Sequence, residues 1–287
     1  MTALSALSAA LRDWDPAPLT GDDVVSGAVV AAVSAMFDLD PVAADGDPLP
    51  PLWHWFAFLD VPPMSALGED GHPAHGRFLP PVPDRRRMIA GGRLEWRAPW
   101  RVGERVTRTT ALHDVRVRTG RSGEMAFVTT RSEFAAGGRT LAVEEQDVVY
   151  RSQPAGSARG IAAPQPEPRP AHEWELTLPT SSPLLFRMSA LTANAHRIHY
   201  DQPYATGVEG YPGLVVHGPL LALLGLEIPR RHLPGTRVGR YEYRLVAPAF
   251  AGPDVWAGGT ASGASVEVEA GSDGGPVSLR GRVGLSG

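Results

Sequence analysis

Cysteine and lysine are both missing from this chain of 287 residues. Without cysteine there is no disulfide framework, no thiolate nucleophile, no iron–sulfur cluster and no cysteine-ligated zinc site. All 27 basic residues are arginine, so a mechanism that needs a lysine Schiff base or a P-loop lysine is excluded. We attribute the missing lysine to the codon usage of a GC-rich genome rather than to function.

Long hydrophobic runs and an excess of charge are also lacking. The longest apolar stretches, residues 24–37 and 214–226, are shorter than the ~18 residues that a membrane-spanning helix requires. The net charge is −4 and the pI is near 6.1, which gives no reason to expect nucleic acid or an anionic membrane as a partner. The first residues lack the basic and apolar segments of a signal peptide. We expect a soluble, cytoplasmic protein.

A proline-rich segment divides the chain. Residues 151–171 contain five prolines, which fit neither a helix interior nor a central strand. We therefore predict a linker at 151–171 between one domain at 1–150 and another at 172–287. The hydrophobic fraction of 43% allows a substantial core.

The two halves resemble each other. Gly92-Arg-Leu-Glu-Trp-Arg, followed by a proline and Gly103, is echoed by Gly239-Arg-Tyr-Glu-Tyr-Arg, followed by a proline and Gly252. An internal repeat of one structural unit explains the echo better than chance. Strand-like runs separated by turns follow each copy, and one apolar helical segment precedes each block. We expect strands at 102–114, 125–134, 139–150, 255–261, 265–270 and 277–283, and helices at 23–37 and 217–228.

This pattern predicts an α+β fold in which a curved antiparallel sheet wraps around a helix, twice. Asp22 or Asp23 is a suitable N-cap for the first helix, and Pro219 suits the first turn of the second.

Residues 186–201 hold two histidines, an asparagine, arginines and an aspartate in one short segment, and His217 follows beside an apolar run. A histidine serves as both general base and general acid because its pKa lies near neutrality. Proton removal next to a carbonyl also needs donors for the enolate oxygen, and a helix N-terminus at His217-Gly218-Pro219 offers them. The alternative is a packed core histidine followed by a helix-entry turn.

Other kinds of site have weak support. The chain has no Gly-x-Ser-x-Gly elbow, no Gly-x-Gly-x-x-Gly loop and no Walker sequence, so serine-hydrolase, Rossmann and P-loop functions lose their main motifs. His196 and His199 have the spacing of two metal ligands, but no third ligand is evident nearby, and we expect no metal. His72 and His75 lie in a Gly/Pro-rich loop, where we expect surface or structural roles.

Long motifs carry a resemblance to a known family. His199-Tyr-Asp201, with Asn194 before it and Val-Val-His217-Gly-Pro-Leu after it, resembles the active-site motifs of MaoC-like hydratases of the hot-dog fold. The chain is most similar to the subgroup of mesaconyl-C4-CoA hydratases, itaconyl-CoA hydratases and type 2 hydroxyacyl-thioester dehydratases. The shared motifs span nearly the whole chain: Leu49-Pro-Pro-Leu-Trp-His-Trp, Asp70-Gly-His-Pro, Phe78-Leu-Pro-Pro, Arg87-Met, Glu145-Gln-Asp-Val-Val-Tyr-Arg, Ser189-Ala-Leu-Thr, His196-Arg-Ile-His-Tyr-Asp and Glu209-Gly-Tyr-Pro-Gly-Leu-Val-Val-His-Gly-Pro-Leu.

The resemblance implies a double hot-dog fold and a hydro-lyase (EC 4.2.1) that hydrates a 2-enoyl thioester or dehydrates a 3-hydroxyacyl thioester. The implied substrate is a short or branched acyl-CoA such as mesaconyl-C4-CoA, with no cofactor beyond the CoA or acyl-carrier thioester itself. The oligomeric state stays open, with a homodimer as the assembly to test. His199 falls on the catalytic histidine, and Gly218 falls where a backbone N–H holds the thioester carbonyl, next to His217. Asn194 stands where the broader family has a catalytic aspartate.

An amide transfers no proton at neutral pH, so Asn194 is expected to position water or a hydroxyl. The second proton-transfer group stays open between His199 acting through water, His196 and Tyr200. Arg187 either binds a substrate carboxylate or a CoA phosphate, or forms an ion pair with Asp201 or Glu209.

Met188 and Ala193 replace aromatic residues of the subgroup, which either enlarges the acyl pocket or only changes packing. The first half, which lacks a His-x-Asp motif in its repeat, is expected to shape the pocket. The alternative functions are a 3-hydroxyacyl-ACP dehydratase, a thioester hydrolase and an inactive partner or binding subunit.

Overall fold

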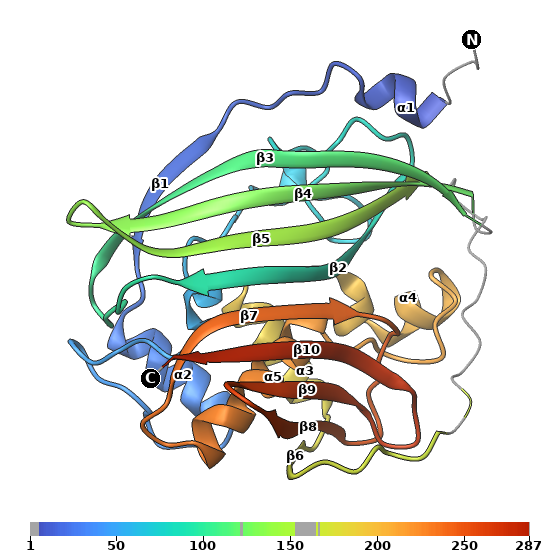
Figure 1. Ribbon diagram of the computed structural model, residues 1–287. Coiled ribbons are helices and arrows are strands. Elements are labelled where there is room, and N and C mark those ends of the chain that lie inside the picture. Colours follow the sequence, from blue (N-terminus) through green and yellow to red (C-terminus); the bar gives the residue numbers. More distant parts are fainter. Residues whose placement is uncertain (1–5, 121–122, 153–164, 166, 287) are drawn as a thin grey trace.

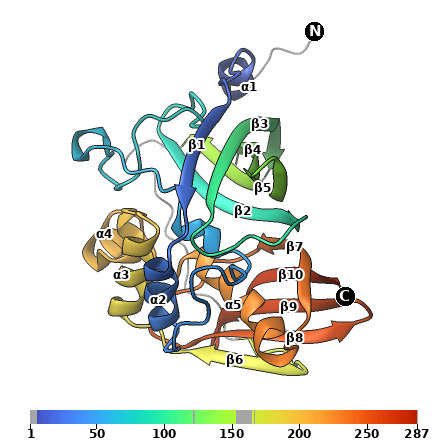
Figure 2. The same cartoon turned by 90° about the vertical axis from the view of Figure 1, so that its left-hand side faces the viewer.

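Ten antiparallel strands form one continuous sheet, with the helices on one side of it (Figures 1 and 2). The computed structural model describes residues 6–120, 123–152, 165 and 167–286. The strands of the first half are β1 Leu19–Val24, β2 Arg85–Trp96, β3 Arg105–Gly120, β4 Gly123–Ala136 and β5 Arg139–Ser152. Those of the second half are β6 Trp174–Leu178, β7 Arg237–Leu245, β8 Val255–Ser262, β9 Ser265–Ser272 and β10 Val277–Ser286.

The strand order shows that the two halves are equivalent units. Across the sheet it runs β1-β3-β4-β5-β2 and then β7-β10-β9-β8-β6. We number the strands of each half from one to five along the chain. Read from the outer edge of the sheet toward its centre, both halves then have the order 1-3-4-5-2. The halves meet where β2 pairs with β7, and these are the two strands that carry the echoed sequence. The predicted repeat and the α+β class are therefore confirmed.

Small residues let the two halves join closely. Gly92 of β2 lies opposite Tyr243 of β7, and the neighbouring Gly91 lies opposite Arg244. A β-carbon on Gly91 would lie 2.3 Å from the carbonyl oxygen of Tyr243. A larger residue at this position would therefore push the central strands apart.

The helices differ between the halves. They are α1 Ala6–Leu11, α2 Gly27–Met36, α3 Ser182–Leu191, α4 Gln202–Gly207 and α5 Gly218–His232, with the short 3₁₀ helices η1 Trp53–Phe56, η2 Met64–Ala66 and η3 Arg197–His199. The long helix α5 packs against β6, β8, β9 and β10, as expected for the second half. Helix α2 contacts α3 instead, on the left of Figure 2.

The first predicted helix begins later than expected. Residues 19–24 pair with β3 as the edge strand β1, so the helix starts at Gly27. Its N-cap is Ser26, whose side chain accepts a hydrogen bond from the Val29 N–H, rather than Asp22 or Asp23. Asp23 instead accepts a hydrogen bond of 2.7 Å from the Phe58 N–H and ties β1 to a distant loop.

The second helix and the expected strands agree better with the structure. All six predicted strands are present, several of them longer than expected, and α5 continues past the predicted end through Pro229. The predicted linker falls mostly on residues 153–164 and 166, which lie outside the described residues. Among those that are described, no helix is both long enough and apolar enough to cross a membrane.

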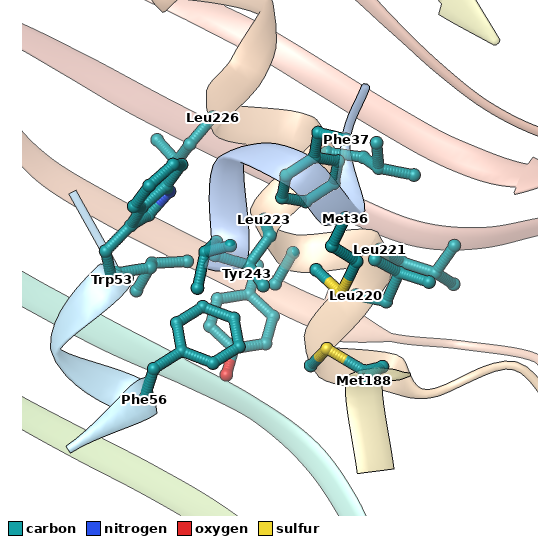
Figure 3. Packing of buried hydrophobic residues seen from close by; sticks show 14 of the residues in the cluster. Met36, Phe37, Trp53, Phe56, Met188, Leu220, Leu221, Leu223, Leu226 and Tyr243 are labelled. Carbon is teal, nitrogen blue, oxygen red and sulfur yellow. The ribbon is translucent and has the colours of Figure 1, made fainter. Parts of the chain in front are cut away.

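The main core lies where the halves meet. Trp53 and Phe56 of η1 pack with Leu223 and Leu226 of α5 and with Tyr243 of β7 (Figure 3). Residues of α2 and α3 complete the same cluster, among them Met36, Phe37 and Met188. Met188 is 1% exposed, so it fills core space. Because both halves contribute to this core, each half covers apolar surface of the other.

Candidate active site

His199 lies at the end of η3 with one ring nitrogen occupied. Its Nδ1 is 2.7 Å from the carbonyl oxygen of Val215, and the side chain is buried. A carbonyl only accepts, so Nδ1 carries the hydrogen and Nε2 keeps its lone pair in the neutral ring. Burial lowers the pKa of His199 to about 4. The structure therefore holds a neutral base at the position predicted for the catalytic histidine.

His217 packs flat against His199. The two ring centroids are 3.7 Å apart with an interplanar angle of 15°. Nε2 of His217 is 2.9 Å from Ser189 Oγ on α3, and burial holds the pKa of His217 well below its ordinary value. The stack fixes the plane of His199, so His217 is both a packed core residue and a neighbour of the proposed base.

Gly218 is the first residue of α5, directly after His217. Within the described part of the chain its N–H has no hydrogen-bond acceptor, and Pro219 has no N–H to compete for one. A β-carbon at this position would lie 2.4 Å from Leu245 Cδ1. The end of the Leu245 side chain would have to move to admit a larger residue. Gly218 also leaves a backbone donor at the positive end of a helix dipole, which is the arrangement that stabilises an oxyanion.

A loop of the first half completes the site. His72 lies against His196 at 3.8 Å between ring centroids, and His196 makes an edge contact of 5.5 Å with His199. His72 Nδ1 is 2.9 Å from Asp70 Oδ2. We call His72, His196, His199 and His217 the histidine cluster. Our prediction of a surface or structural role for His72 did not anticipate this place, whereas His75 is exposed.

Close backbone packing docks this loop. The Arg197 N–H donates to the Asp70 carbonyl oxygen at 2.9 Å. Gly71 has φ +86, and a β-carbon there would lie 1.9 Å from the carbonyl oxygen of Ala195. The contact joins residues far apart in sequence, so spacing alone could not reveal it; the motif Asp70-Gly-His-Pro was its only signal.

Asn194 and Tyr200 support the segment that presents the histidines. Asn194 Oδ1 accepts a hydrogen bond of 3.1 Å from the His196 N–H, next to Ala193 in the left-handed region at φ 50. Tyr200 donates its hydroxyl hydrogen to the carbonyl oxygen of Ala195 at 2.9 Å. Because both groups bind the backbone of their own segment, neither is placed as a free proton-transfer group.

Arg187 makes no contact with the histidine cluster among the described residues. Its guanidinium donates to the carbonyl oxygen of Ala35 on α2 at 3.2 Å. The expected ion pair with Asp201 or Glu209 was wrong, since those carboxylates pair with Arg197 and Arg86 respectively.

Arg87 is the arginine near the histidine cluster. Burial is the first cause that lowers the pKa of His72 and His196, and the positive charge of Arg87 lowers it further. Burial lowers the pKa of Arg87 itself. No carboxylate of the described residues lies within ion-pair distance of it, so this guanidinium is available to an anion.

Asp70, His72 and His196 offer three ligand atoms within 4.8 Å of one another, the one such group found within the described ranges. The geometry suits a metal poorly. Asp70 already occupies His72 Nδ1, the rings of His72 and His196 lie at only 35° to each other, and the charge of Arg87 repels a cation. A hydrogen-bonded carboxylate–imidazole pair describes these residues better.

The arrangement of the strands defines a double hot-dog fold. The chain resembles the MaoC-like dehydratase from Phytophthora capsici with a TM-score of 0.67 and 15% identity, over 98% of each chain. It also resembles Rv0216 from Mycobacterium tuberculosis, which is described as having a double hotdog fold, with a TM-score of 0.53 and 16% identity over 94% of this chain and 96% of that one.

Sequence comparison gives the family. Residues 52–251 match the model for hydroxyacyl-thioester dehydratase type 2. The chain is 43% identical to mesaconyl-C(4)-CoA hydratase of Chloroflexus aurantiacus over 233 residues, which cover 80% of this chain and 81% of that protein. It is 47% identical to the mitochondrial hydroxyacyl-thioester dehydratase type 2 of Schizosaccharomyces pombe over 83 residues, 28% of this chain and 27% of that one. The chain belongs to the type 2 hydroxyacyl-thioester dehydratase family, and the predicted resemblance is confirmed.

Proposed function

We propose that this protein is a hydro-lyase that adds water to a 2-enoyl thioester and removes it from a 3-hydroxyacyl thioester. One observation carries the proposal: His199, whose Nδ1 is held by the Val215 carbonyl, stacks on His217, and the next residue, Gly218, has an N–H without an acceptor among the described residues. Removing a proton from the carbon next to a thioester requires a base and a donor for the enolate oxygen, and His199 and the Gly218 N–H supply both. The hydratases and dehydratases among its relatives support the same reaction.

The dehydration direction is the simpler one to follow. The thioester carbonyl oxygen accepts a hydrogen bond from Gly218 N–H, which acidifies the α-carbon. His199 Nε2 takes the α-proton, and negative charge develops on the carbonyl oxygen. The enolate then expels the β-hydroxyl as water, which requires a proton from a second group. Hydration reverses these steps.

For the acyl group we propose a short or branched enoyl-CoA that carries a free carboxylate in addition to the thioester, as mesaconyl-C4-CoA does. Arg87 supports this class. Its partly buried guanidinium has no carboxylate within ion-pair distance among the described residues, so it favours an anionic group close to the histidine cluster. The alternative is an acyl-ACP substrate. Thioester hydrolysis has less support, because the position of the needed carboxylate is taken by Asn194. An inactive subunit is disfavoured by the intact base and oxyanion donor.

The test is incubation of the purified protein with a panel of enoyl-CoA and 3-hydroxyacyl-CoA substrates in heavy-oxygen water, followed by mass spectrometry. We expect label in one class of acyl group. His199→Gln should lower kcat by about 10²- to 10⁴-fold, the usual contribution of an acid–base group, while His75→Gln, on an exposed side chain, keeps full turnover. Turnover of His199→Gln above a tenth of wild type would contradict the assignment. Size-exclusion chromatography and cell fractionation would test the predicted homodimer and cytoplasmic location.

Arg87 tests the acyl group separately. Arg87→Met should raise the KM for mesaconyl-C4-CoA more than tenfold and leave the KM for crotonyl-CoA within about threefold, because only the first substrate loses an ion pair worth a few kcal/mol when partly buried. Arg187→Met is the matched control and should change neither KM. An equal effect of Arg87→Met on both substrates would assign this guanidinium to the CoA part instead.

A further inference from the structure

The reaction needs a second proton-transfer group, and the second half of the chain does not provide one. Asn194 has no titratable proton, and its Oδ1 binds the His196 N–H. The Tyr200 hydroxyl binds a backbone carbonyl and the residue is 45% exposed. His196 has no carboxylate within ion-pair distance among the described residues, and burial lowers its pKa to about 2. Without a carboxylate hydrogen-bonded to its ring, the His196 imidazolium has little to offset the effect of burial.

His72 differs from these residues by its carboxylate partner. Asp70 binds His72 twice, through Oδ2 to the ring Nδ1 at 2.9 Å and through Oδ1 to the backbone N–H at 3.0 Å. The neighbouring His72 holds the pKa of Asp70 well below its ordinary value, against the effect of burial, so the carboxyl is ionised. Burial lowers the pKa of His72, and the Asp70 carboxylate acts against this by stabilising the imidazolium form. Asp70 also fixes Nδ1 as the bonded nitrogen, so the second ring nitrogen of His72 is Nε2.

The loop that carries this pair is held rigidly. The Asp70 carbonyl oxygen accepts from Arg197 N–H, only two residues before His199. Gly71 touches the backbone at Ala195. Because the catalytic segment itself anchors the loop, His72 is positioned relative to His199 by short backbone contacts rather than by side-chain packing alone.

We propose that His72, oriented by Asp70, is the catalytic residue that exchanges a proton with the oxygen at the β-carbon, while His199 serves the α-carbon. This inference rests on the proposed hydratase function. It gives the first half of the chain a catalytic role, beyond the shaping of a pocket.

The proton balance is complete with these two groups. In dehydration His199 Nε2 takes the α-proton, the C–H electron pair forms the C=C bond by way of the enolate, and the C–O bond breaks. The leaving oxygen takes a proton from Nε2 of the His72 imidazolium and departs as water. His199 then carries one proton more and His72 one fewer, and transfer through solvent restores the pair. Hydration runs the same steps backward.

The experiment separates the two proton transfers. Wild type, His72→Gln, Asp70→Asn and His199→Gln are compared in hydration rate and in exchange of the α-protons of the corresponding saturated acyl-CoA in heavy water, measured by mass spectrometry. The saturated compound has no β-oxygen, so its exchange needs only His199 and Gly218. His75→Gln from the same loop is the control, and thermal unfolding verifies that each variant is folded.

We expect His72→Gln to lose at least 100-fold in hydration and to keep α-proton exchange within about threefold of wild type. His199→Gln should lose both activities. Asp70→Asn should lose hydration less than His72→Gln, since it removes only the orienting carboxylate, and it serves as the second variant if His72→Gln does not fold.

Two results would overturn the role of His72: hydration by both loop variants within threefold of wild type, or a loss of α-proton exchange as large as the loss of hydration. Loss of wild-type activity on dialysis against a chelator, restored by Zn²⁺, would reassign Asp70, His72 and His196 as a metal site. If the wild-type protein turned over no thioester of the panel, the proposed function itself would be refuted. This result differs from one in which the wild type is active and only the role of His72 is wrong.

Discussion

At the scale of single residues, the histidine cluster couples the site to the stability of the fold. Burial is the first cause that lowers the pKa in every member: His72, His196, His199 and His217. A histidine whose pKa is lower in the folded chain than in the unfolded chain binds fewer protons when folded. Its neutral form therefore supports folding fully above pH 6.5, and this support is lost as the pH falls toward the folded pKa.

We expect the free energy of unfolding to decrease between pH 7.5 and pH 5. For His199 alone, whose pKa falls from 6.5 to about 4, the loss by pH 5 is about 2 kcal/mol, since each pKa unit corresponds to about 1.4 kcal/mol. Urea unfolding curves at the two pH values measure it. His199→Gln should show a smaller decrease than wild type; an equal decrease would mean that His199 does not titrate in this window.

Asn194 has a structural role that the sequence did not predict: its side chain holds the backbone of the segment that carries the histidines. Replacing it by alanine removes the acceptor of the His196 N–H, and we expect a loss of about 1 kcal/mol in unfolding free energy together with lower kcat. Asn194→Asp keeps an acceptor at the same place and should retain most of the stability. Chemical unfolding and steady-state rates, measured on the same variants, distinguish this structural role of Asn194 from a role limited to positioning the substrate water. Unchanged stability of Asn194→Ala would contradict it.

At the scale of elements, the start of α5 links packing to catalysis. A β-carbon at Gly218 would collide with the end of the Leu245 side chain, so either that side chain or the first turn of α5 would have to move. We expect Gly218→Ala to displace the first turn of α5, lowering kcat at least tenfold through the misplaced N–H. Gly213→Ala is the matched control, because a β-carbon added at Gly213 would have nothing within 4 Å.

The double variant Gly218→Ala, Leu245→Ala tests whether the contact with Leu245 is the cause of the lower kcat of Gly218→Ala. Removing the Leu245 side chain makes room for the new methyl group, so kcat should recover at least partly despite the cavity left behind. No recovery, in a protein that still folds, would show that the glycine is needed for something other than its contact with Leu245. Steady-state kinetics of the three variants measure this.

The elements that the sequence predicted are those with a local pattern. Alternation of period two marks β4, β5 and β9, and an apolar run behind His217-Gly218-Pro219 marks α5, because these signals need only neighbouring residues. Strand β1 was missed: Leu19-Thr-Gly-Asp-Asp-Val is polar and becomes a strand only by pairing with β3. In the same way His199 and Gly218 were predicted from adjacent motifs. The place of His72 depends instead on the contact of its loop with Ala195 and Arg197, which are more distant in the sequence.

At the scale of the whole molecule, the site belongs to both halves. The proposed base His199 and the proposed donor Gly218 come from the second half, and the Asp70–His72 pair comes from the first. The strands β2 and β7 join the halves edge to edge, and η1 of the first half packs on α5 of the second (Figure 3). The internal repeat thus does within one chain what an interface does between two subunits.

Dividing the chain tests this arrangement. We expect residues 167–287 alone to lack hydration activity, because the fragment loses the Asp70–His72 pair and exposes the core that η1 covers. Co-expression with residues 1–152 should restore turnover to within about tenfold of the intact protein, since the shared core and the β2–β7 pairing drive reassociation. The control is His72→Gln in the first fragment, which should allow the fragments to co-purify without restoring activity. Copurification on a tag and the rate assay measure the two effects separately. Turnover by residues 167–287 alone, comparable with that of the whole chain, would show that the first half contributes no catalytic residue.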